Sequence, residues 1–338
     1  MPSDTAASVR RALEDGEGVL RLAPNWVPRS FIAAAKRLKL APGSLYGFGA
    51  GRGAIAERWI ASAVQADNGP ETLPDEGLSY VLGPEKRLLF REAAEAGGAE
   101  VVGAPLSERY GGWPVLGKFF DYLGPIHFQV HMREEEAQLL GRHGKPEAYY
   151  FPPQLNASPG SFPFAFFGLE PGTTKDDVRR CLERWDEGDN GILDLSRAYR
   201  QVPGTGWSLP AGILHGPGSL VAFEPQWGSD VIAIFQSLMN DSPVSREWLV
   251  KDVPEDRRDD LDYIVGLLDW EENVRPDFKR KYFRPPKVDE AASGDGHVDR
   301  WVSYDNGGLF SAKELTVQPG ARLVLRDGHP SGVVAVQG

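Results

Sequence analysis

The sequence predicts a mainly β protein, either a β-sandwich or a β-barrel, with helical additions. Two observations carry this prediction. The chain has 39 glycines and 27 prolines, which favour many turns. Short runs rich in β-branched and aromatic residues, such as 125–132 and 163–172, alternate with those turns along the chain. Runs of this length and spacing are typical of strands in a sandwich or barrel.

The bulk composition limits the classes of protein to which the chain can belong. With 338 residues, 41% of them hydrophobic and 25% charged, it matches a globular protein long enough for two domains. A net charge of -11 argues against nucleic acid or an anionic membrane as the main partner, although a basic pocket could still take a small anion. The single cysteine, Cys181, and the lack of a signal-peptide or membrane-span pattern predict a cytoplasmic location.

In the first third of the chain, the patterns predict more helix than strand. Residues 6–16, 29–39 and 84–97 are predicted as helices, and the run 45–62 is predicted to end in a strand. The glycine-rich segment 47–53 is interpreted as a turn. It lacks the third glycine of the dinucleotide fingerprint and the Gly-Lys-Ser/Thr ending of a phosphate loop.

The middle of the chain combines short strands with two helices. We expect strands in 114–123, 125–132, 148–155 and 163–172, and helices over 133–143 and 173–188. The second of these helices is well marked, because it has a threonine cap and acidic residues in its first turn. Short β-rich runs with turns between them continue to about residue 240.

The composition changes after residue 245. Residues 246–283 are charged, helical and aromatic, with a predicted buried stripe formed by Leu261, Ile264, Val265 and Leu268. Residues 284–297 are predicted to be a linker. A second β unit follows and stops at Gly338 within a predicted strand, 333–336, so we expect that the chain is truncated or that partner strands are missing. These changes divide the chain into an N-terminal domain, a helical segment and the start of a C-terminal domain, with the ranges 1–245, 246–287 and 288–338.

Four polar residues occur in contexts that predict a shared metal site. Gln129 and His131 are two apart, so on a strand their side chains point to the same face. Glu147 follows a turn-rich stretch, as the returning arm of a hairpin would, and His215 follows a Pro-Ala-Gly turn. Imidazole nitrogens with carboxylate and amide oxygens suit a borderline divalent ion such as zinc.

Four ordered blocks of the sequence resemble type I mannose-6-phosphate isomerases (phosphomannose isomerases), a zinc-dependent cupin family. The resemblance runs from about Arg21 to Gly338. The blocks are GRGAIAERWIAS (51–62), GGWPVLGKFFDYLGPIHFQVHMREEEA (111–137), GKPEAYYF (144–151) and PAGILHGPGSLVAFEPQWGSD (210–230).

The resemblance implies a cupin (jelly-roll) barrel, followed by a second, incomplete cupin-like unit. It also implies one zinc ion per chain, or another divalent metal, held by Gln129, His131, Glu147 and His215. It places Lys118 and Lys145 at the phosphate of a sugar phosphate, and Glu224 in the catalytic site. The implied reaction interconverts mannose 6-phosphate and fructose 6-phosphate through an enediol. Glu57 and Trp59 are expected to support the barrel without touching substrate.

Two positions depart from the family pattern and keep alternatives open. His127 replaces a serine of the phosphate site, and its parity with Gln129 makes it a second catalytic candidate beside Glu224. Ile234 stands where the family has a catalytic arginine, which it cannot mimic. The alternatives are an isomerase or epimerase for a different sugar, which could be unphosphorylated, and a non-catalytic sugar-binding cupin. Solvated lysines remain an equal alternative for Lys118 and Lys145.

Overall fold

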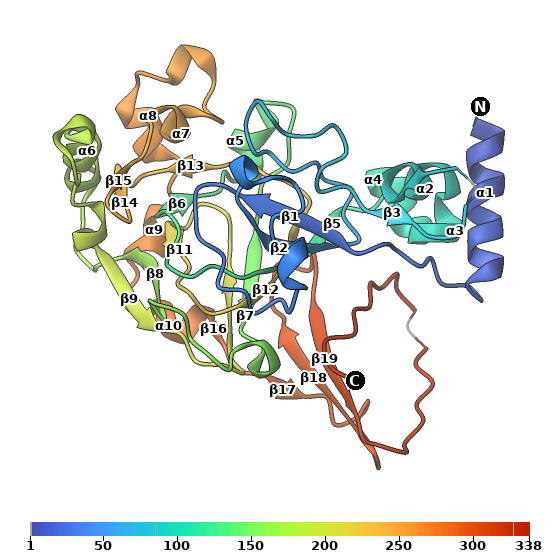
Figure 1. Ribbon diagram of the computed structural model, residues 1–338. Helices are drawn as coiled ribbons and strands as arrows, with labels where there is room; N and C mark the ends of the chain where they lie inside the picture. Colours follow the sequence, from blue (N-terminus) through green and yellow to red (C-terminus); the bar gives the residue numbers. More distant parts are fainter. Residues whose placement is uncertain (1, 85, 327) are drawn as a thin grey trace.

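Two antiparallel sheets, packed face to face, form the centre of the molecule (Figure 1). A computed structural model describes residues 2–84, 86–326 and 328–338. The larger sheet contains, in spatial order, β1 (Asn25–Arg29), β2 (Ala54–Ile60), β5 (Val115–Phe120), β12 (Ala222–Trp227), β7 (Glu147–Tyr150), β10 (Gly206–Leu209) and β16 (Phe283–Arg284). The smaller contains β13 (Ala233–Ile234), β6 (Gln129–Val130), β11 (His215–Gly216), β8 (Phe164–Leu169) and β9 (Ser196–Arg200). The mainly β prediction is confirmed, and among the described residues no strand pairing joins these two central sheets into a closed barrel.

Aromatic side chains fill the space between the two sheets. Because side chains alternate along a strand, Tyr149 and Trp207 of the larger sheet both face Phe167 of the smaller one. The ring centroids lie 4.8 Å apart for Trp207 and Phe167 and 6.2 Å apart for Tyr149 and Phe167. Further along the same inner face, the side chains change from aromatic to charged. That change marks the candidate site.

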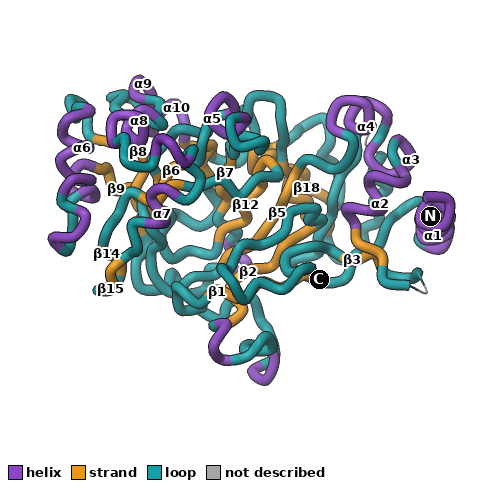
Figure 2. The backbone as a smooth tube through the Cα atoms, turned by 90° about the horizontal axis from the view of Figure 1, so that it is seen from above, coloured by secondary structure: helices purple, strands orange, loops and turns teal. Residues whose placement is uncertain are grey.

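Helices cover the outer face of the smaller sheet. They are α6 (Lys175–Glu183), α7 (Glu247–Val250), α8 (Leu261–Gly266) and α9 (Trp270–Asn273), with α10 (Phe278–Tyr282) beside β16; Figure 2 shows them gathered at the end of the molecule away from the N-terminus. In the predicted stripe, Ile264, Val265 and Leu268 are buried in one cluster with Phe128 and Val130, and Leu261 is partly buried against that cluster, so the stripe is confirmed. No described helix combines the length and the apolar surface that crossing a bilayer requires.

The capping of α6 gives a first prediction. The Thr174 hydroxyl accepts a hydrogen bond from the Asp177 amide at 3.3 Å, and the Asp177 carboxylate accepts one from the Thr174 amide at 2.8 Å. We expect Thr174→Ala to lower the free energy of unfolding by about 1 kcal/mol. Chemical denaturation measures this change. Thr173→Ala removes a neighbouring hydroxyl outside the cap and should cost less than about 0.5 kcal/mol; equal losses in the two variants would rule out the cap as the cause.

The N-terminal third adds a helical layer at one end of the larger sheet. Its elements are α1 (Pro2–Asp15), β3 (Tyr80–Val81), β4 (Leu88–Leu89), α2 (Phe90–Gly97), α3 (Ala99–Val102) and α4 (Ala104–Tyr110). Val9 and Ala12 of α1 pack on Phe90 and Ala93 of α2. The predicted helix over 6–16 is therefore confirmed, and the helix predicted over 84–97 begins later, at Phe90.

The helix predicted over 29–39 is wrong. After β1 the chain runs without a helix, and Ala34 forms a β-bridge with Tyr122. Arg37 then pairs with the buried Asp121 at 2.8 Å, and Lys36 has a left-handed φ of 66°. These tertiary contacts satisfy the backbone and outweigh the helix propensity of the alanine-rich run.

Other elements lie where the sequence patterns predict them but are shorter than predicted. The segment 125–132 contributes only β6, and 133–143 contributes only α5 (Glu134–Gln138). The glycine-rich 47–53 forms a turn, as predicted. Gly53 has φ 79°, and a Cβ there would come 2.2 Å from the Arg29 carbonyl oxygen. Short 3-10 turns lie at η1 (Pro42–Ser44), η2 (Ala50–Arg52), η3 (Pro153–Leu155), η4 (Trp185–Glu187), η5 (Ile192–Leu195) and η6 (Glu255–Arg257).

The C-terminal strands form one small sheet against the outer face of β7 and β10. It contains β17 (Lys287–Val288), β18 (His297–Ser303) and β19 (Ala312–Val317), and a hairpin of β14 (Leu238–Met239) and β15 (Ser242–Pro243) lies elsewhere. Ser208 donates a hydrogen bond to the Asn306 side chain at 2.7 Å, and Tyr150 donates one to Glu314 at 3.0 Å. The predicted linker 284–297 therefore includes strand β17.

The strand predicted at 333–336 is wrong. Residues 333–336 have no strand pairing, and Val333 is 87% exposed. Within the described residues, the valines of 333–336 pair with no neighbouring strand. Their β propensity alone does not form a strand, because it depends on packing against a sheet. The division of the chain at residues 245 and 287 stays a prediction.

Candidate metal centre

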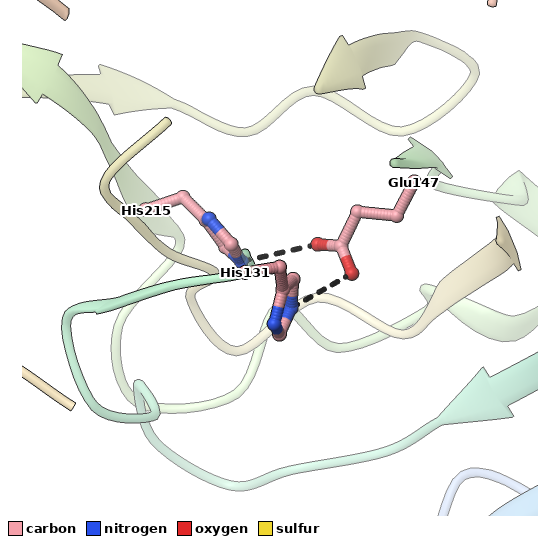
Figure 3. Close-up of side chains that lie close together, drawn as sticks. All are labelled: His131, Glu147 and His215. Carbon is pink, nitrogen blue, oxygen red and sulfur yellow. Dashed lines mark ion pairs between the residues drawn. The ribbon is translucent and has the colours of Figure 1, made fainter. Parts of the chain in front are cut away.

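Two histidines and a glutamate from both sheets converge on the inner face (Figure 3). His131 follows β6, His215 lies on β11 and Glu147 begins β7. The Nε2 atoms of His131 and His215 lie 3.1 Å from Glu147 Oε2 and Oε1, respectively. Two atoms that each bind a tetrahedral zinc ion at about 2.0–2.1 Å are roughly 3.3 Å apart. The spacing therefore suits ligands of one ion.

The backbone fixes which nitrogen of each ring faces the glutamate. The Nδ1 of His131 lies 2.8 Å from the Val231 carbonyl oxygen, and that of His215 lies 2.8 Å from the Ile213 carbonyl oxygen. A carbonyl only accepts hydrogen bonds, so Nδ1 carries the hydrogen and a neutral ring has a lone pair on Nε2. Backbone acceptors on Nδ1 are typical of histidines that bind metal.

That arrangement leaves the Nε2 lone pairs of the two neutral histidine rings facing the Glu147 carboxylate. Burial, with Lys145 nearby, lowers the pKa of His131 to about 4, so its ring is neutral near pH 7. Both Nε2 atoms are buried without a hydrogen-bond partner among the described residues. Burial opposes ionisation of Glu147, whereas positive charge on the facing imidazoles, when they are protonated, and on Lys145 holds its pKa well below the usual range. A cation between these groups would satisfy all of them, so the residues present fit a divalent metal.

Gln129 lies next to His215 on the smaller sheet. The two residues are paired across β6 and β11, and paired residues of an antiparallel ladder share a face. Gln129 is 7% exposed. Its side-chain oxygen therefore belongs to the same inner row as His215, where the sequence predicts a fourth ligand.

Glu224 and Lys118 form a buried ion pair beside the histidines. They are paired across β12 and β5, and the Lys118 Nζ lies 2.9 Å from Glu224 Oε1. Burial and the nearby Glu147 raise the pKa of Glu224 to about 8, against the opposing effect of Lys118. Lys145 is also buried and lies 3.5 Å from Glu147 Oε2 and 3.9 Å from Asp230. Both predicted lysines thus lie among carboxylates of the site.

Arg29 is a buried residue of this region that the patterns miss. Its Nε and Nη2 bind the two oxygens of Glu57 at 2.7 and 3.1 Å. Glu57 also accepts hydrogen bonds from Trp59, at 2.6 Å, and from Tyr122. Burial opposes the charge, but Arg29 and Lys118 lower the pKa of Glu57 to about 2. Residues 25–29 (NWVPR) show no period-two alternation, so no local pattern places Arg29 on a strand.

His127 lies among aromatic side chains. Its ring centroid is 5.6 Å from that of Phe31, and burial lowers its pKa to about 4. The described contacts place it beside Phe31, which in turn lies 6.4 Å from the Tyr122 ring. The catalytic role predicted for His127 stays a prediction.

Comparison with solved structures shows what this fold is similar to. The mannose 6-phosphate isomerase of Bacillus subtilis matches with a TM-score of 0.56 and 18% identity, over 88% of this chain and 80% of that one. A candidate mannosephosphate isomerase of Archaeoglobus fulgidus matches with 0.55 and 17%, over 84% and 77%. This chain has the mannose-6-phosphate isomerase fold. No model of a known protein family matches the sequence. No curated protein matches it either.

The mannose-6-phosphate isomerase fold is compatible with metal binding. A third structure, a mannose 6-phosphate isomerase bound with zinc and yttrium, matches with a TM-score of 0.50 and 14% identity over 83% of this chain and 79% of that one. Identities at this level show the fold alone.

The position where the sequence lacks the expected arginine is apolar. Ile234 is paired with Gln129 across β13 and β6, is 2% exposed and belongs to a cluster of buried apolar side chains. Arg133 does not replace that cation at the site, because it pairs with Glu136 on α5. The structure instead places the buried guanidinium of Arg29 near Lys118. Arg29 pairs with Glu57, and Lys118 also acts on the Glu57 carboxylate.

Proposed function

We propose that this chain is a metal-dependent aldose–ketose isomerase of the mannose-6-phosphate isomerase type. The observation that carries the proposal is the buried His131, Glu147 and His215 group, with the Glu224–Lys118 ion pair beside it. The shared fold supports it. Such a reaction moves a proton between C1 and C2 of a sugar through an enediol.

His131, Glu147 and His215 would hold the metal, with Gln129 as the fourth ligand. Two imidazoles with oxygen donors suit zinc, one ion per chain, and also accept other divalent ions. When bound, such an ion supplies Lewis-acid polarisation of the sugar oxygens and stabilises negative charge as it develops.

Glu224 is the residue that we expect to carry the proton. With a pKa of about 8, its carboxyl group exchanges a proton readily near neutral pH, which is what general acid–base catalysis requires. Lys118 holds this side chain at 2.9 Å and thereby orients it toward the inner face. His127 is the second candidate for proton transfer, at the edge where Phe31 is 42% exposed. We expect a sugar to enter from that edge.

The substrates to assay first are mannose 6-phosphate, which the name of a structural neighbour contains, and fructose 6-phosphate, its isomer in the proposed reaction. The buried lysines, Lys118 and Lys145, are the cations that would face a phosphate. A coupled assay of metal-loaded protein with this pair and with the corresponding free sugars tests the reaction class. Absence of turnover on every sugar, with the metal bound, would count against an isomerase.

Glu224→Gln is expected to reduce turnover by about 100- to 10,000-fold, because the amide cannot exchange the proton. The amide keeps the size of the side chain, so the metal content should stay that of the wild type. Elemental analysis and steady-state kinetics measure the two quantities. Glu170→Gln, on the exposed surface, is the matched control. Loss of metal together with activity would mean that Glu224 supports the metal centre instead.

The apolar Ile234 favours a second candidate, a sugar-binding protein without turnover. An arginine at that position could stabilise developing charge, and an isoleucine cannot. Sugars would then raise the melting temperature of the metal-loaded protein while no isomer appears. This candidate would be excluded if the wild-type protein forms product, even slowly, and the Glu224→Gln variant forms none.

A further inference from the structure

The Glu147 carboxylate is held by side chains other than the two histidines. Its oxygens face the imidazole nitrogens of His131 and His215, each at 3.1 Å (Figure 3). The hydroxyl of Tyr149 donates a hydrogen bond to Oε1, the oxygen that also faces His215. The Lys145 ammonium lies 3.5 Å from Oε2, the oxygen that also faces His131. Each carboxylate oxygen therefore faces one imidazole and one hydrogen donor.

The position of Tyr149 follows from the strand that carries it. Tyr149 comes two residues after Glu147 on β7, so both side chains lie on the inner face of the larger sheet. The Tyr149 ring centroid lies 5.8 Å from that of Phe120, at a right angle, and 6.2 Å from that of Phe167, nearly parallel. Only 1% of Tyr149 is exposed. Because the ring is packed between two others, its hydroxyl stays beside the carboxylate.

The same local arrangement occurs at a second buried glutamate of this sheet. Trp59 comes two residues after Glu57 on β2, and its Nε1 donates to Glu57 Oε2 at 2.6 Å. There the aromatic donor helps to fix the carboxylate that pairs with Arg29. An aromatic donor two positions after a buried glutamate is thus a local way to orient a carboxylate on the inner face. At Glu147 the carboxylate so oriented is a candidate metal ligand.

A hydrogen donor on a ligand oxygen can orient the ligand without displacing the metal. Each carboxylate oxygen has two lone pairs, so Oε1 can accept from Tyr149 and still offer the other lone pair to an ion. Groups that bond to the far side of a ligand fix its orientation and tune the metal affinity. We infer that Tyr149 is a positioning residue of the metal centre, whose hydroxyl holds the Glu147 carboxylate between the two imidazoles. This inference rests on the proposed function, which assigns Glu147 to a metal.

Loss of the hydroxyl would change the balance of attractions on Glu147. Lys145 would then be the only described hydrogen donor left beside the carboxylate, apart from any proton on the imidazoles. The carboxylate could turn toward this ammonium, which competes with the ion for Oε2. The ligand oxygens would leave the position that both imidazoles share, and the affinity for the metal should fall.

Tyr149→Phe tests the inference, because it removes the hydroxyl and keeps the packed ring. The zinc affinity of the full chain is measured by competition with a chromophoric chelator. We expect binding about 10- to 100-fold weaker than in the wild type, the usual effect of removing a group behind a ligand. Tyr122→Phe is the matched control. Tyr122 is also buried, stacks on Phe120 with centroids 5.0 Å apart and donates its hydroxyl hydrogen to Glu57.

The control variant should change the zinc affinity less than about threefold, because its hydroxyl serves a carboxylate outside the metal centre. Thermal melting of the metal-free forms shows whether both variants fold as the wild type does. An unchanged affinity in Tyr149→Phe, or equal losses in the two variants, would overturn the inference.

The visible spectrum of the cobalt-loaded chain separates positioning from a general effect on stability, since its bands depend on the ligand geometry around the ion. We expect the bands to shift in Tyr149→Phe and to match the wild type in Tyr122→Phe. Unshifted bands in Tyr149→Phe would overturn the inference even if the affinity falls.

The failure of the proposed function is distinguishable from the failure of this inference. If the wild type binds zinc and isomerises no sugar, the proposed isomerase fails, and the affinity of Tyr149→Phe still decides the role of Tyr149. If the wild type binds neither zinc nor cobalt, the metal centre and the inference fail together. If the wild type binds both and Tyr149→Phe binds them equally well, the inference alone fails.

Discussion

His131→Ala and His215→Ala are each expected to abolish metal retention. Each imidazole would supply one of two nitrogen ligands, and each variant would leave one imidazole with the Glu147 carboxylate and Gln129, too few strong ligands to retain a borderline ion during dialysis. Since changes to the groups behind a ligand already cost 10- to 100-fold in affinity, loss of a ligand should cost more than about 100-fold. The measurement is the metal content per chain after dialysis against a weak chelator. Wild type should keep about one ion per chain.

His143→Ala is the control for these variants. His143 lies in the turn before Lys145 and pairs with Glu134 at 3.0 Å, with its side chain 60% exposed. Its replacement should leave metal content unchanged. Full occupancy in both His131→Ala and His215→Ala would remove the premise of a metal centre, whatever the activity of the variants.

Arg29→Met is expected to lower the free energy of unfolding by about 3–5 kcal/mol, because it leaves Glu57 charged and buried without its partner. Chemical denaturation measures the loss. The double variant Arg29→Met/Glu57→Gln removes both charges and should recover much of it. Arg179→Met breaks an exposed pair with Glu183 and should cost less than about 1 kcal/mol. A loss in Arg29→Met as small as this would contradict the account of the Glu57 network.

The same pair predicts a pH dependence. Glu57 has a folded-state pKa of about 2, below its ordinary value of 4.5, so the pair stabilises the folded state fully above pH 4.5. The contribution falls as the pH drops from 4.5 toward 2, because in this range the carboxylate is protonated in the unfolded chain but still ionised in the folded one. The difference in stability between wild type and Arg29→Met should therefore shrink below pH 4.5. A difference that stays constant down to pH 2 would mean that charge pairing is not its origin.

The sequence places the metal-centre candidates because their signals are local. Two-residue spacing puts Gln129 and His131 on one face, and the Pro-Ala-Gly turn precedes His215. Such patterns need only a strand and its neighbouring turn. The structure then brings His131, Glu147 and His215 within 4.8 Å of one another, through pairings of strands far apart in the chain.

Arg29 and Asp230 lie beyond such local patterns. The partner of Arg29 is 28 residues away, and only the pairing of β1 with β2 brings it to Glu57. The alanine-rich run after Arg29 predicts a helix, whereas the Arg37–Asp121 pair and the Ala34–Tyr122 bridge hold it extended. Asp230 belongs to the site through its distance to Lys145, which no spacing encodes. Long-range pairing decides these positions.

Zinc-edge anomalous diffraction from crystals of the metal-loaded chain tests the central claim most directly. The account predicts one strong peak between His131, His215 and Glu147, about 2.0–2.1 Å from each Nε2 atom and about 2.0–2.2 Å from a carboxylate oxygen. A map with no peak there, in crystals grown with excess zinc, would show that these three side chains hold no ion. A peak bound only by surface residues would contradict the claim equally.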